Sequence, residues 1–208
     1  MPRPLGRRNP DYEEKRDRLI HDLTEYVLRS ELTRPSFRQL AMAGQVAEPT
    51  LRHYFGDRET VASEILRVLG GRAEPLIKAV AQPCDTMERA VDGYVQLSRA
   101  GVAHGAFARA HAFGLIEGVA DEQVGKAYLE TLLEPSLQAL EERLGAHLPE
   151  GAKPETKRAA ALMVFAPMLL AVLHQQLLGG AASAPVDLDL LFSELARLTV
   201  QGLQTAKA

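Results

Sequence analysis

Four polar side chains stand close together in the stretch 48–53 of this chain, namely Glu48, Thr50, Arg52 and His53. If the stretch is helical, these side chains can point outward while Leu51 faces a core. Short polar groups and a forked guanidinium can hydrogen-bond to base edges in a major groove, which is wide enough to admit a helix. The chemistry that this segment offers is therefore contact with the bases and phosphates of double-stranded DNA.

Catalytic chemistry is not indicated by any motif in the chain. The sequence contains no G-x-S-x-G elbow, no P-loop, no H-E-x-x-H and no G-x-G-x-x-G. His104 and His111 lie seven residues apart without a third ligand at a suitable spacing, so a metal site is not favoured. We therefore predict a protein that is not an enzyme, with no catalytic residues, no cofactor and no metal.

Two short helices and a tight turn would hold the polar face. Ser36 can cap the first helix by accepting a hydrogen bond from a free backbone N–H, and apolar residues recur at helical spacing over 37–41. Ala43 and Gly44 allow close approach and a turn, and Gly44 is free to take a positive φ. Pro49 fits the first turn of the second helix. An amphipathic helix over 16–30 would brace the pair, although helical hairpins that bind nothing share this pattern.

The stretch 18–59 resembles the DNA-binding domain of the tetracycline-repressor (TetR) family. The resemblance is carried by Leu40-Ala41, Gly44-Gln45-Val46, Pro49-Thr50-Leu51, His53-Tyr54-Phe55 and Gly56-Asp57-Arg58-Glu59. Three positions depart from the family pattern: Gln45 replaces the usual Gly, Ala47 the usual Ser or Thr cap, and Arg52 the usual Tyr. The resemblance implies a dimeric transcriptional regulator in which Arg58 contacts a phosphate.

The predicted DNA contacts combine the outward face with nearby cations. They are Arg7, Arg8, Ser36, Arg38, Glu48, Pro49, Thr50, Arg52, His53 and Arg58. Arg7 and Arg8 belong to a basic arm that either lies along the DNA, as homeodomain arms do, or is a solvated terminus. The chain has 24 basic and 27 acidic residues, but residues 1–58 hold 11 Lys and Arg against 9 Asp and Glu. What positive charge there is therefore lies at the N-terminal end.

Composition and pattern predict an all-α fold. Of 208 residues 46% are hydrophobic, and no alternating β-run of useful length appears. We expect a helix-turn-helix DNA-binding domain with its arm in residues 1–56, and a larger helical effector-binding and dimerisation domain in 57–208. Further helices are predicted at 57–69 continuing to 81, 84–103, 106–117, 121–147, 154–178 and 187–205, with interruptions at Gly70-Gly71 and Pro75.

Other sequence features favour the cytoplasm. The single cysteine, Cys84, excludes an intrachain disulfide and suits a reducing compartment. The N-terminus lacks an apolar signal core. The apolar run 159–173 contains Pro167 and is shorter than the roughly 20 residues that a membrane span needs, so we predict a buried helix there.

The resemblance also implies an effector cavity and a dimer interface. The predicted effector-binding residues are Tyr94, Phe107, His111, Phe113, Tyr128, Met163 and Phe165, each of which could instead be plain core. The predicted dimer-interface residues are Leu170, Leu173, Leu191, Leu195 and Leu198. They lie on the last two helices, the first of which is apolar almost all round and needs cover, although an ordinary intrachain pair would give the same pattern.

These features together predict a homodimeric transcriptional regulator. Its partners would be a double-stranded DNA operator, a small apolar or aromatic effector of unknown identity and a second copy of the chain, with no membrane. As a repressor, it would bind a near-palindromic operator with the helix-turn-helix units, or reading heads, of its two copies. Ligand would change the spacing of these units through the helix that begins at Asp57, and the protein would leave the DNA. The alternative is a helical protein-interaction adaptor that has lost specific DNA binding, which the residues at 45, 47 and 52 would permit.

Overall fold

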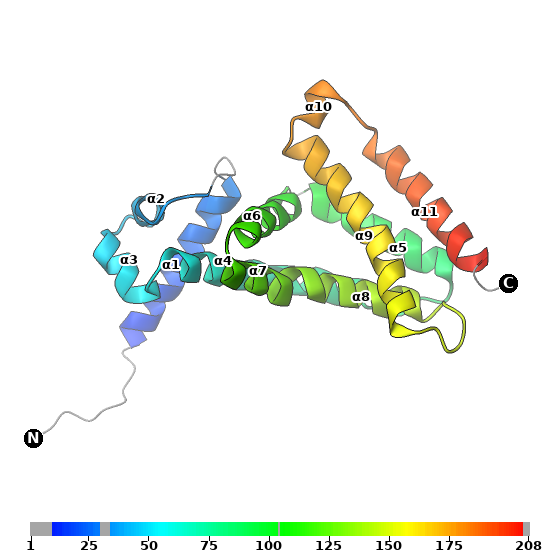
Figure 1. The fold of residues 1–208 in the computed structure, drawn as a ribbon, viewed down its shortest axis with the longest axis horizontal. Helices are drawn as coiled ribbons and strands as arrows, with labels where there is room; N and C mark the ends of the chain where they lie inside the picture. Colours follow the sequence, from blue (N-terminus) through cyan, green and yellow to red (C-terminus); the bar gives the residue numbers. More distant parts are fainter. Residues whose placement is uncertain (1–9, 30–33, 104, 206–208) are drawn as a thin grey trace, which may run out of the picture.

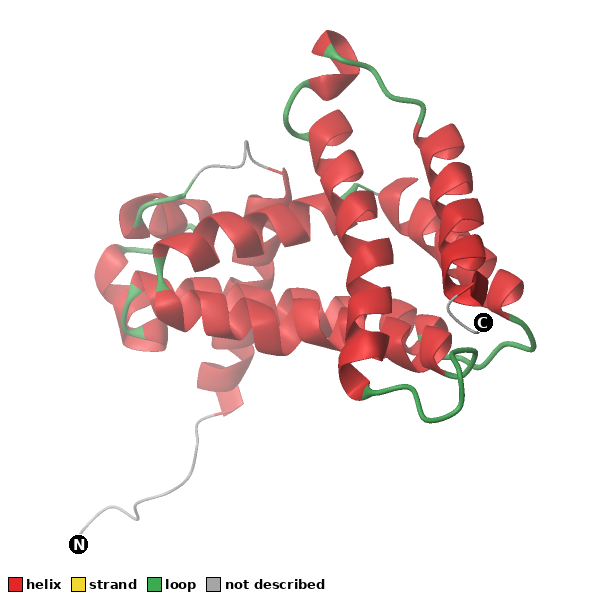
Figure 2. Ribbon diagram, turned by 45° about the vertical axis from the view of Figure 1, so that its right-hand side comes forward, coloured by secondary structure: helices red, strands yellow, loops and turns green. Residues whose placement is uncertain are grey.

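The computed structural model describes residues 10–29, 34–103 and 105–205. Every regular element in these ranges is a helix (Figure 2), which confirms the predicted all-α class. The helices are α1 (Pro10–Arg29), α2 (Phe37–Ala43), α3 (Glu48–Phe55), α4 (Arg58–Val80), α5 (Met87–Ala103), α6 (Ala106–Ala120), α7 (Glu122–Tyr128), the π-helical turn η1 (Leu129–Leu133), α8 (Glu134–Gly145), α9 (Pro154–Gln176), α10 (Gly180–Ser183) and α11 (Leu188–Thr205).

Helix α1 begins at Pro10, well before the predicted start near residue 16. Proline suits the first turn of a helix because its missing N–H would have no intrahelical partner there. Asp11 and Glu13 place negative charge in the same turn, where it interacts favourably with the helix dipole. These local signals extend α1 by almost two turns toward the N-terminus.

Helix α4 is unbroken from Arg58 to Val80, so the predicted interruption at Gly70-Gly71 and Pro75 is wrong. Gly70 is buried, and a Cβ at this position would collide with the carbonyl of Thr131 in η1. The glycine therefore allows α4 and η1 to approach closely. Gly71 and Pro75 lie on the exposed side, where water can satisfy the carbonyl that loses its partner to proline.

The buried apolar side chains form two clusters, and α4 passes through both. One cluster joins α1, α2 and α3 to the first half of α4 and to α6, α7 and η1. The other joins the end of α4 to α5, α8, α9 and α11. Figure 1 shows α1–α3 at one end of the molecule and α9 and α11 at the other. The apolar core of the N-terminal helices thus continues past residue 56 into α4, α6 and α7.

Arg143 on α8 ties α4 to α5 from a buried position. Its Nε donates to the carbonyl of Ala90 at 2.6 Å, and Nη1 donates to the carbonyls of Val80 and Gln82 at 3.0 and 3.2 Å. The last carbonyls of a helix lack intrahelical partners and carry partial negative charge, so a cation at the end of α4 is favourable. This contact fixes the end of α4 against the second cluster.

Helix α9 is long and apolar enough to cross a membrane by length and composition. In the fold, however, it packs along α8 and also contacts α11, burying Ala161 and Val164 among its inward side chains. Met163 and Leu170 lie on the opposite face with 71% and 63% of their surface exposed. The apolar character of α9 is therefore divided between the intrachain core and an exposed stripe.

Candidate nucleic-acid interface and ligand cavity

The helix-turn-helix unit consists of α2, a short turn and α3. Ser36 caps α2 as predicted: its Oγ accepts from the backbone N–H of Gln39 at 3.2 Å, and Oε1 of Gln39 accepts from the N–H of Ser36 at 2.8 Å. This reciprocal pair is a capping box. Helix α3 has Ala47 at its N-cap, where no side-chain oxygen can cap, and Pro49 in its first turn.

The turn between α2 and α3 differs from the prediction in one respect. Gly44 has a φ of −78°, and the left-handed conformation falls on Gln45 instead, with a φ of 54°. The close approach expected at Gly44 is present, because a Cβ there would collide with Cδ1 of Leu19 on α1 and that side chain would have to shift. A left-handed backbone costs an L-residue about 1–2 kcal/mol, so Gln45 is strained.

Helix α3 presents its polar side chains to solvent as its spacing predicted. Leu51 and Phe55 are buried against α1 and α4. The exposed residues on α3 are Glu48, Pro49, Thr50, Arg52 and His53, and Arg38 is exposed on α2. These helices therefore offer hydrogen-bonding groups and cations on the surface that a groove would meet.

Two contacts hold the polar face of α3 in place. The guanidinium of Arg52 lies 4.9 Å from the centre of the Phe37 ring, and its Nη1 donates to the carbonyl of Gly56 at 3.2 Å. On the other side, Tyr12 of α1 packs against the rings of His53 and Tyr54, with ring centres 5.6 and 4.9 Å apart. The prediction missed Tyr12 because it placed the start of α1 after this residue.

Arg58, a predicted phosphate contact, points into the protein instead. Only 15% of its side chain is exposed. Its Nη1 and Nη2 donate to the two carboxylate oxygens of Glu117 on α6 at 2.9 and 2.5 Å, and its Nε donates to the carbonyl of Pro35 at 2.7 Å. A guanidinium engaged in this way is not available to a phosphate in this conformation, which corrects the prediction for Arg58.

Glu117 is fully buried, at 0% exposure, and it also accepts a hydrogen bond from Nε of Arg34 at 3.3 Å. We call Arg34, Arg58 and Glu117 the junction cluster. It joins the segment before α2, the start of α4 and the second half of α6 around one carboxylate. The predicted contacts Arg7 and Arg8 lie outside the described residues.

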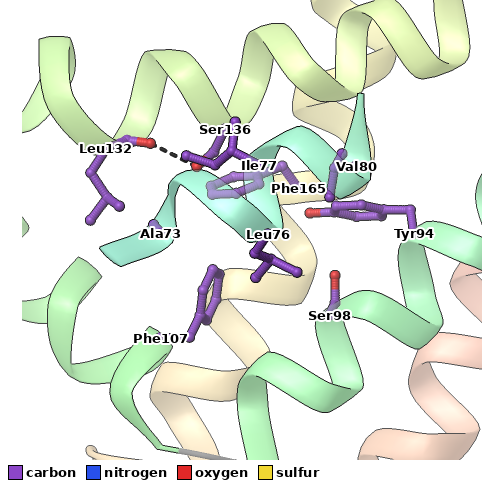
Figure 3. Close-up of a pocket in the computed structure, with 10 residues that line it drawn as sticks. All are labelled: Ala73, Leu76, Ile77, Val80, Tyr94, Ser98, Phe107, Leu132, Ser136 and Phe165. Carbon is purple, nitrogen blue, oxygen red and sulfur yellow. Dashed lines mark hydrogen bonds between the residues drawn. The ribbon is translucent and has the colours of Figure 1, made fainter. Parts of the chain in front are cut away.

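Two apolar hollows lie beside the middle of α4. The inner cavity has a volume of about 50 Å³ and is lined by Ala73, Leu76, Ile77, Val80, Tyr94, Ser98, Phe107, Leu132, Ser136 and Phe165 (Figure 3). The outer cavity has a volume of about 300 Å³ and is lined by Leu28, Leu69, Arg72, Ala73, Leu76, Ala106, Phe107, Ala110, His111 and Leu132. The two cavities are neighbours, because Ala73, Leu76, Phe107 and Leu132 line both of them. The larger one reaches the lower end of the volumes typical of ligand pockets.

Four of the seven predicted effector residues line these cavities, and the other three lie elsewhere. Tyr94 and Phe165 line the inner cavity, His111 lines the outer one and Phe107 lines both. Met163 lies on the exposed face of α9, so its assignment to a cavity wall is corrected. Helix α9 is apolar on all sides, and its sequence did not show which face points inward.

Phe113 and Tyr128, also predicted for the effector site, line neither cavity. Both are buried in the cluster that contains α1–α3. Tyr128 nevertheless reaches the outer cavity indirectly, because its hydroxyl lies 2.9 Å from Nδ1 of His111 in a hydrogen bond. Tyr128 therefore connects the cavity wall to the core of the N-terminal helices.

The polar groups around the cavities are few and neutral apart from Arg72. Burial raises the pKa of Tyr94 to about 12, partly opposed by its hydrogen bond to Ser98. The hydroxyl of Ser136 donates to the carbonyl of Leu132 at 2.7 Å (Figure 3). Burial lowers the pKa of His111 to about 4, so this ring is neutral at physiological pH. The arrangement suits an apolar ligand that makes a few hydrogen bonds.

Metal binding has no support in the described ranges, where no three His, Cys, Asp or Glu side chains gather to hold an ion. His104 lies outside these ranges.

The predicted dimer residues also separate into two groups. Leu170 on α9 and Leu198 on α11 are exposed, at 63% and 56%. Leu173, Leu191 and Leu195 are half-buried and pack against the intrachain core. The last two helices thus pair with one another within the chain and also leave apolar side chains uncovered.

The chain was compared with protein families, with curated proteins and with solved structures, and only the solved structures gave matches. No protein-family model matches the sequence, and neither does any curated protein. Among solved structures, one from Mesorhizobium loti that is named a TetR-family transcriptional regulator is 17% identical over 95% of this chain and 98% of that one, with a TM-score of 0.62. A transcriptional regulator from Pseudomonas aeruginosa is 15% identical over 96% and 93% of the two chains, with a TM-score of 0.64.

A third neighbour is the regulator FadR from Bacillus subtilis, solved in complex with stearoyl-CoA. It is 17% identical over 92% of this chain and 98% of that one, with a TM-score of 0.56. The chain therefore has the fold of TetR-family transcriptional regulators, as the sequence resemblance implied.

The strain at Gln45 gives a first prediction. Replacing Gln45→Gly should raise the free energy of unfolding by about 0.5–1 kcal/mol, because glycine adopts a positive φ without the side-chain clash but is more flexible when unfolded. Urea denaturation would measure the change. The matched control is Gln138→Gly at an exposed position of α8, which should lower stability by about 1 kcal/mol. Destabilisation by both variants would show that Gln45 is not strained.

The junction cluster gives a second prediction. Glu117→Ala leaves Arg58 without its buried partner and should destabilise the protein by about 3 kcal/mol. Combining Glu117→Ala with Arg58→Ala should cost clearly less than the sum of the single changes, with a coupling of about 2 kcal/mol in a double-mutant cycle. The control Glu130→Ala removes an exposed pair with Lys126 and should change stability by less than about 0.5 kcal/mol. Additive effects at 58 and 117 would refute the junction.

Proposed function

We propose that this protein is a cytoplasmic, homodimeric, DNA-binding transcriptional regulator of the TetR family. The observation that supports the proposal most directly is the exposed polar face of α3, held on a helix-turn-helix unit by Arg52, Phe37 and Tyr12. A helix that reads DNA must present such groups from a rigid support. The fold that the chain shares with transcriptional regulators agrees with this use.

In the proposed complex, α3 enters the major groove. Arg52 and Thr50 contact base edges or phosphates, and Arg38 contacts the backbone from α2. Glu48 and His53 complete the reading face. Arg58 does not contact DNA in this arrangement. It supports the helix-turn-helix unit from within the protein, through the junction cluster.

We further propose that two copies associate through the exposed apolar residues of α9 and α11. Met163, Leu170, Leu190 and Leu198 are between 56% and 71% exposed on these two helices, and a second copy would cover them. A two-fold dimer would place two α3 helices roughly 34–36 Å apart, on successive turns of one duplex face. The operator would then be nearly palindromic.

The effector would bind in the cavities beside α4 and release the protein from DNA, which makes it a repressor. Helix α4 carries the cavity walls at residues 69–80 and the junction cluster at its start, so a displacement in the cavity can reach the reading head. A full reversal of occupancy from 99:1 would need a preference of about 5.5 kcal/mol for the released state. Since one neighbour was solved with stearoyl-CoA, acyl compounds belong among the first ligands to test.

The DNA-binding proposal is tested by fluorescence anisotropy on duplexes selected from genomic fragments, across a salt series. We expect a selected site bound in the nanomolar range, with affinity that falls steeply as salt rises. Arg52→Ala should weaken binding by about 1–3 kcal/mol. Arg67→Ala, which changes an exposed arginine on α4 away from α3, should not weaken it. Weak binding that is blind to sequence would favour the adaptor alternative.

The dimer proposal is tested by sedimentation. Leu170→Glu combined with Leu198→Glu places charge on the exposed stripe and should convert a dimer to a monomer, because an unpaired charge at a buried interface is costly. Val119→Glu is the control, since Val119 is 89% exposed on α6 and lies outside α9 and α11. A double variant that remains dimeric would place the interface elsewhere.

A further inference from the structure

The outer cavity has one charged residue in its wall. It lies between the end of α1, the middle of α4, the start of α6 and η1, and eight of its ten lining residues are apolar. The other two are Arg72 on α4 and His111 on α6. In a wall of this kind, a single cation largely decides which ligand head group can bind.

Arg72 currently binds two groups on α1. Its Nη1 donates to Oε1 of Glu25 at 2.7 Å, and its Nη2 donates to Nδ1 of His21 at 3.0 Å. About a third of the Arg72 side chain is exposed, so solvent reaches the contact. The hydrogen bond from Arg72 lowers the pKa of the Glu25 carboxyl, which is therefore ionised at neutral pH.

Glu25 has a second cationic partner. Its Oε2 accepts from Nη2 of Arg29 at 3.2 Å. If the carboxylate of a ligand paired with Arg72, Glu25 would remain paired with Arg29. Both carboxylates would then have a cationic partner. The exchange conserves ion pairs, and it takes place at a partly hydrated rim where ion pairs are weak and readily replaced.

His111 provides a different group to the same cavity. It is 1% exposed, and its Nδ1 is occupied by the hydroxyl of Tyr128. Its Nε2 is buried and has no hydrogen-bond partner among the residues that the structure describes. A buried polar atom without a partner is costly, and a ligand atom that hydrogen-bonds to it would remove that cost.

From these contacts we propose that the outer cavity binds an amphipathic carboxylate, whose carboxylate replaces Glu25 on Arg72 and whose apolar chain lies against Leu76 and Phe107. The proposal rests on the proposed function only in taking this cavity as the effector site. A carboxylate fits because the guanidinium fork presents parallel N–H groups that match its two oxygens.

The exchange would have a consequence for the reading head. The contacts of Arg72 with Glu25 and His21 tie α4 to α1, and α1 braces α3 through Tyr12. A ligand that occupies Arg72 removes this tie. By reciprocity, a conformation that needs the tie binds the ligand more weakly.

The test is calorimetric titration of the full chain with decanoate and with decanol, which share an apolar chain and differ in charge. The wild type should bind decanoate about ten-fold or more tightly than decanol. Arg72→Gln should abolish this preference and leave decanol binding unchanged. Glu25→Gln should raise the affinity for decanoate and leave that for decanol unchanged, because it removes the competing carboxylate. Arg67→Gln, five residues earlier on α4, should behave as wild type.

Several results would overturn the proposal. They are equal affinity for decanoate and decanol, a preference that survives Arg72→Gln, weaker decanoate binding in Glu25→Gln, or no binding of either compound. Ala73→Phe, which places a ring in the wall that both cavities share, should weaken binding of both compounds, and unchanged binding would place the site elsewhere. DNA titrations without ligand keep the two proposals distinct. Sequence-selective DNA binding without a carboxylate preference overturns only this inference, and the reverse result overturns only the proposed regulator.

Discussion

The carboxylate of Glu117 is the constraint around which the two ends of the molecule are arranged. A buried charge is tolerated only when it is paired and hydrogen-bonded, and Arg58 meets both oxygens of this one while Arg34 supplies a third donor. These partners come from α4 and from the segment before α2, whereas Glu117 belongs to α6. Separating any of the three segments would leave a charge without its partner, so α6 and the helix-turn-helix unit must move together or exchange the pair for another.

Helix α4 connects this constraint to the cavities. Its first turn holds Arg58, its middle lines both hollows, and its end is fixed by Arg143 through Val80. Arg72 adds a tie from the same helix to α1. The proposed mechanism depends on the continuity of α4 through Gly70 and Pro75, because a helix broken there would not transmit a displacement from the cavity to the junction cluster.

The features that the sequence predicted well depend on neighbours along the chain. The cap at Ser36 and the outward face of α3 follow from spacing within one or two turns. The start of α1 was missed although its signals are local, but the error at Arg58 involves a distant partner, because Arg58 finds Glu117 across 59 positions. Met163 was misplaced because α9 has apolar residues on every face. Periodicity cannot orient such a helix, and only its contacts with α8 and α11 do so.

Two local features destabilise the helix-turn-helix unit, so contacts with residues distant in sequence are needed to hold it. A missing cap at Ala47 costs about 1 kcal/mol and the left-handed Gln45 about 1–2 kcal/mol. The stacking of Arg52 on Phe37 and the packing of Tyr12 on Tyr54 each return about 0.5–1.5 kcal/mol. The helix-turn-helix unit is therefore held by tertiary contacts more than by its own turn. In the proposed regulator, loosening the ties from α4 to α1 and α6 would therefore weaken the support of α3.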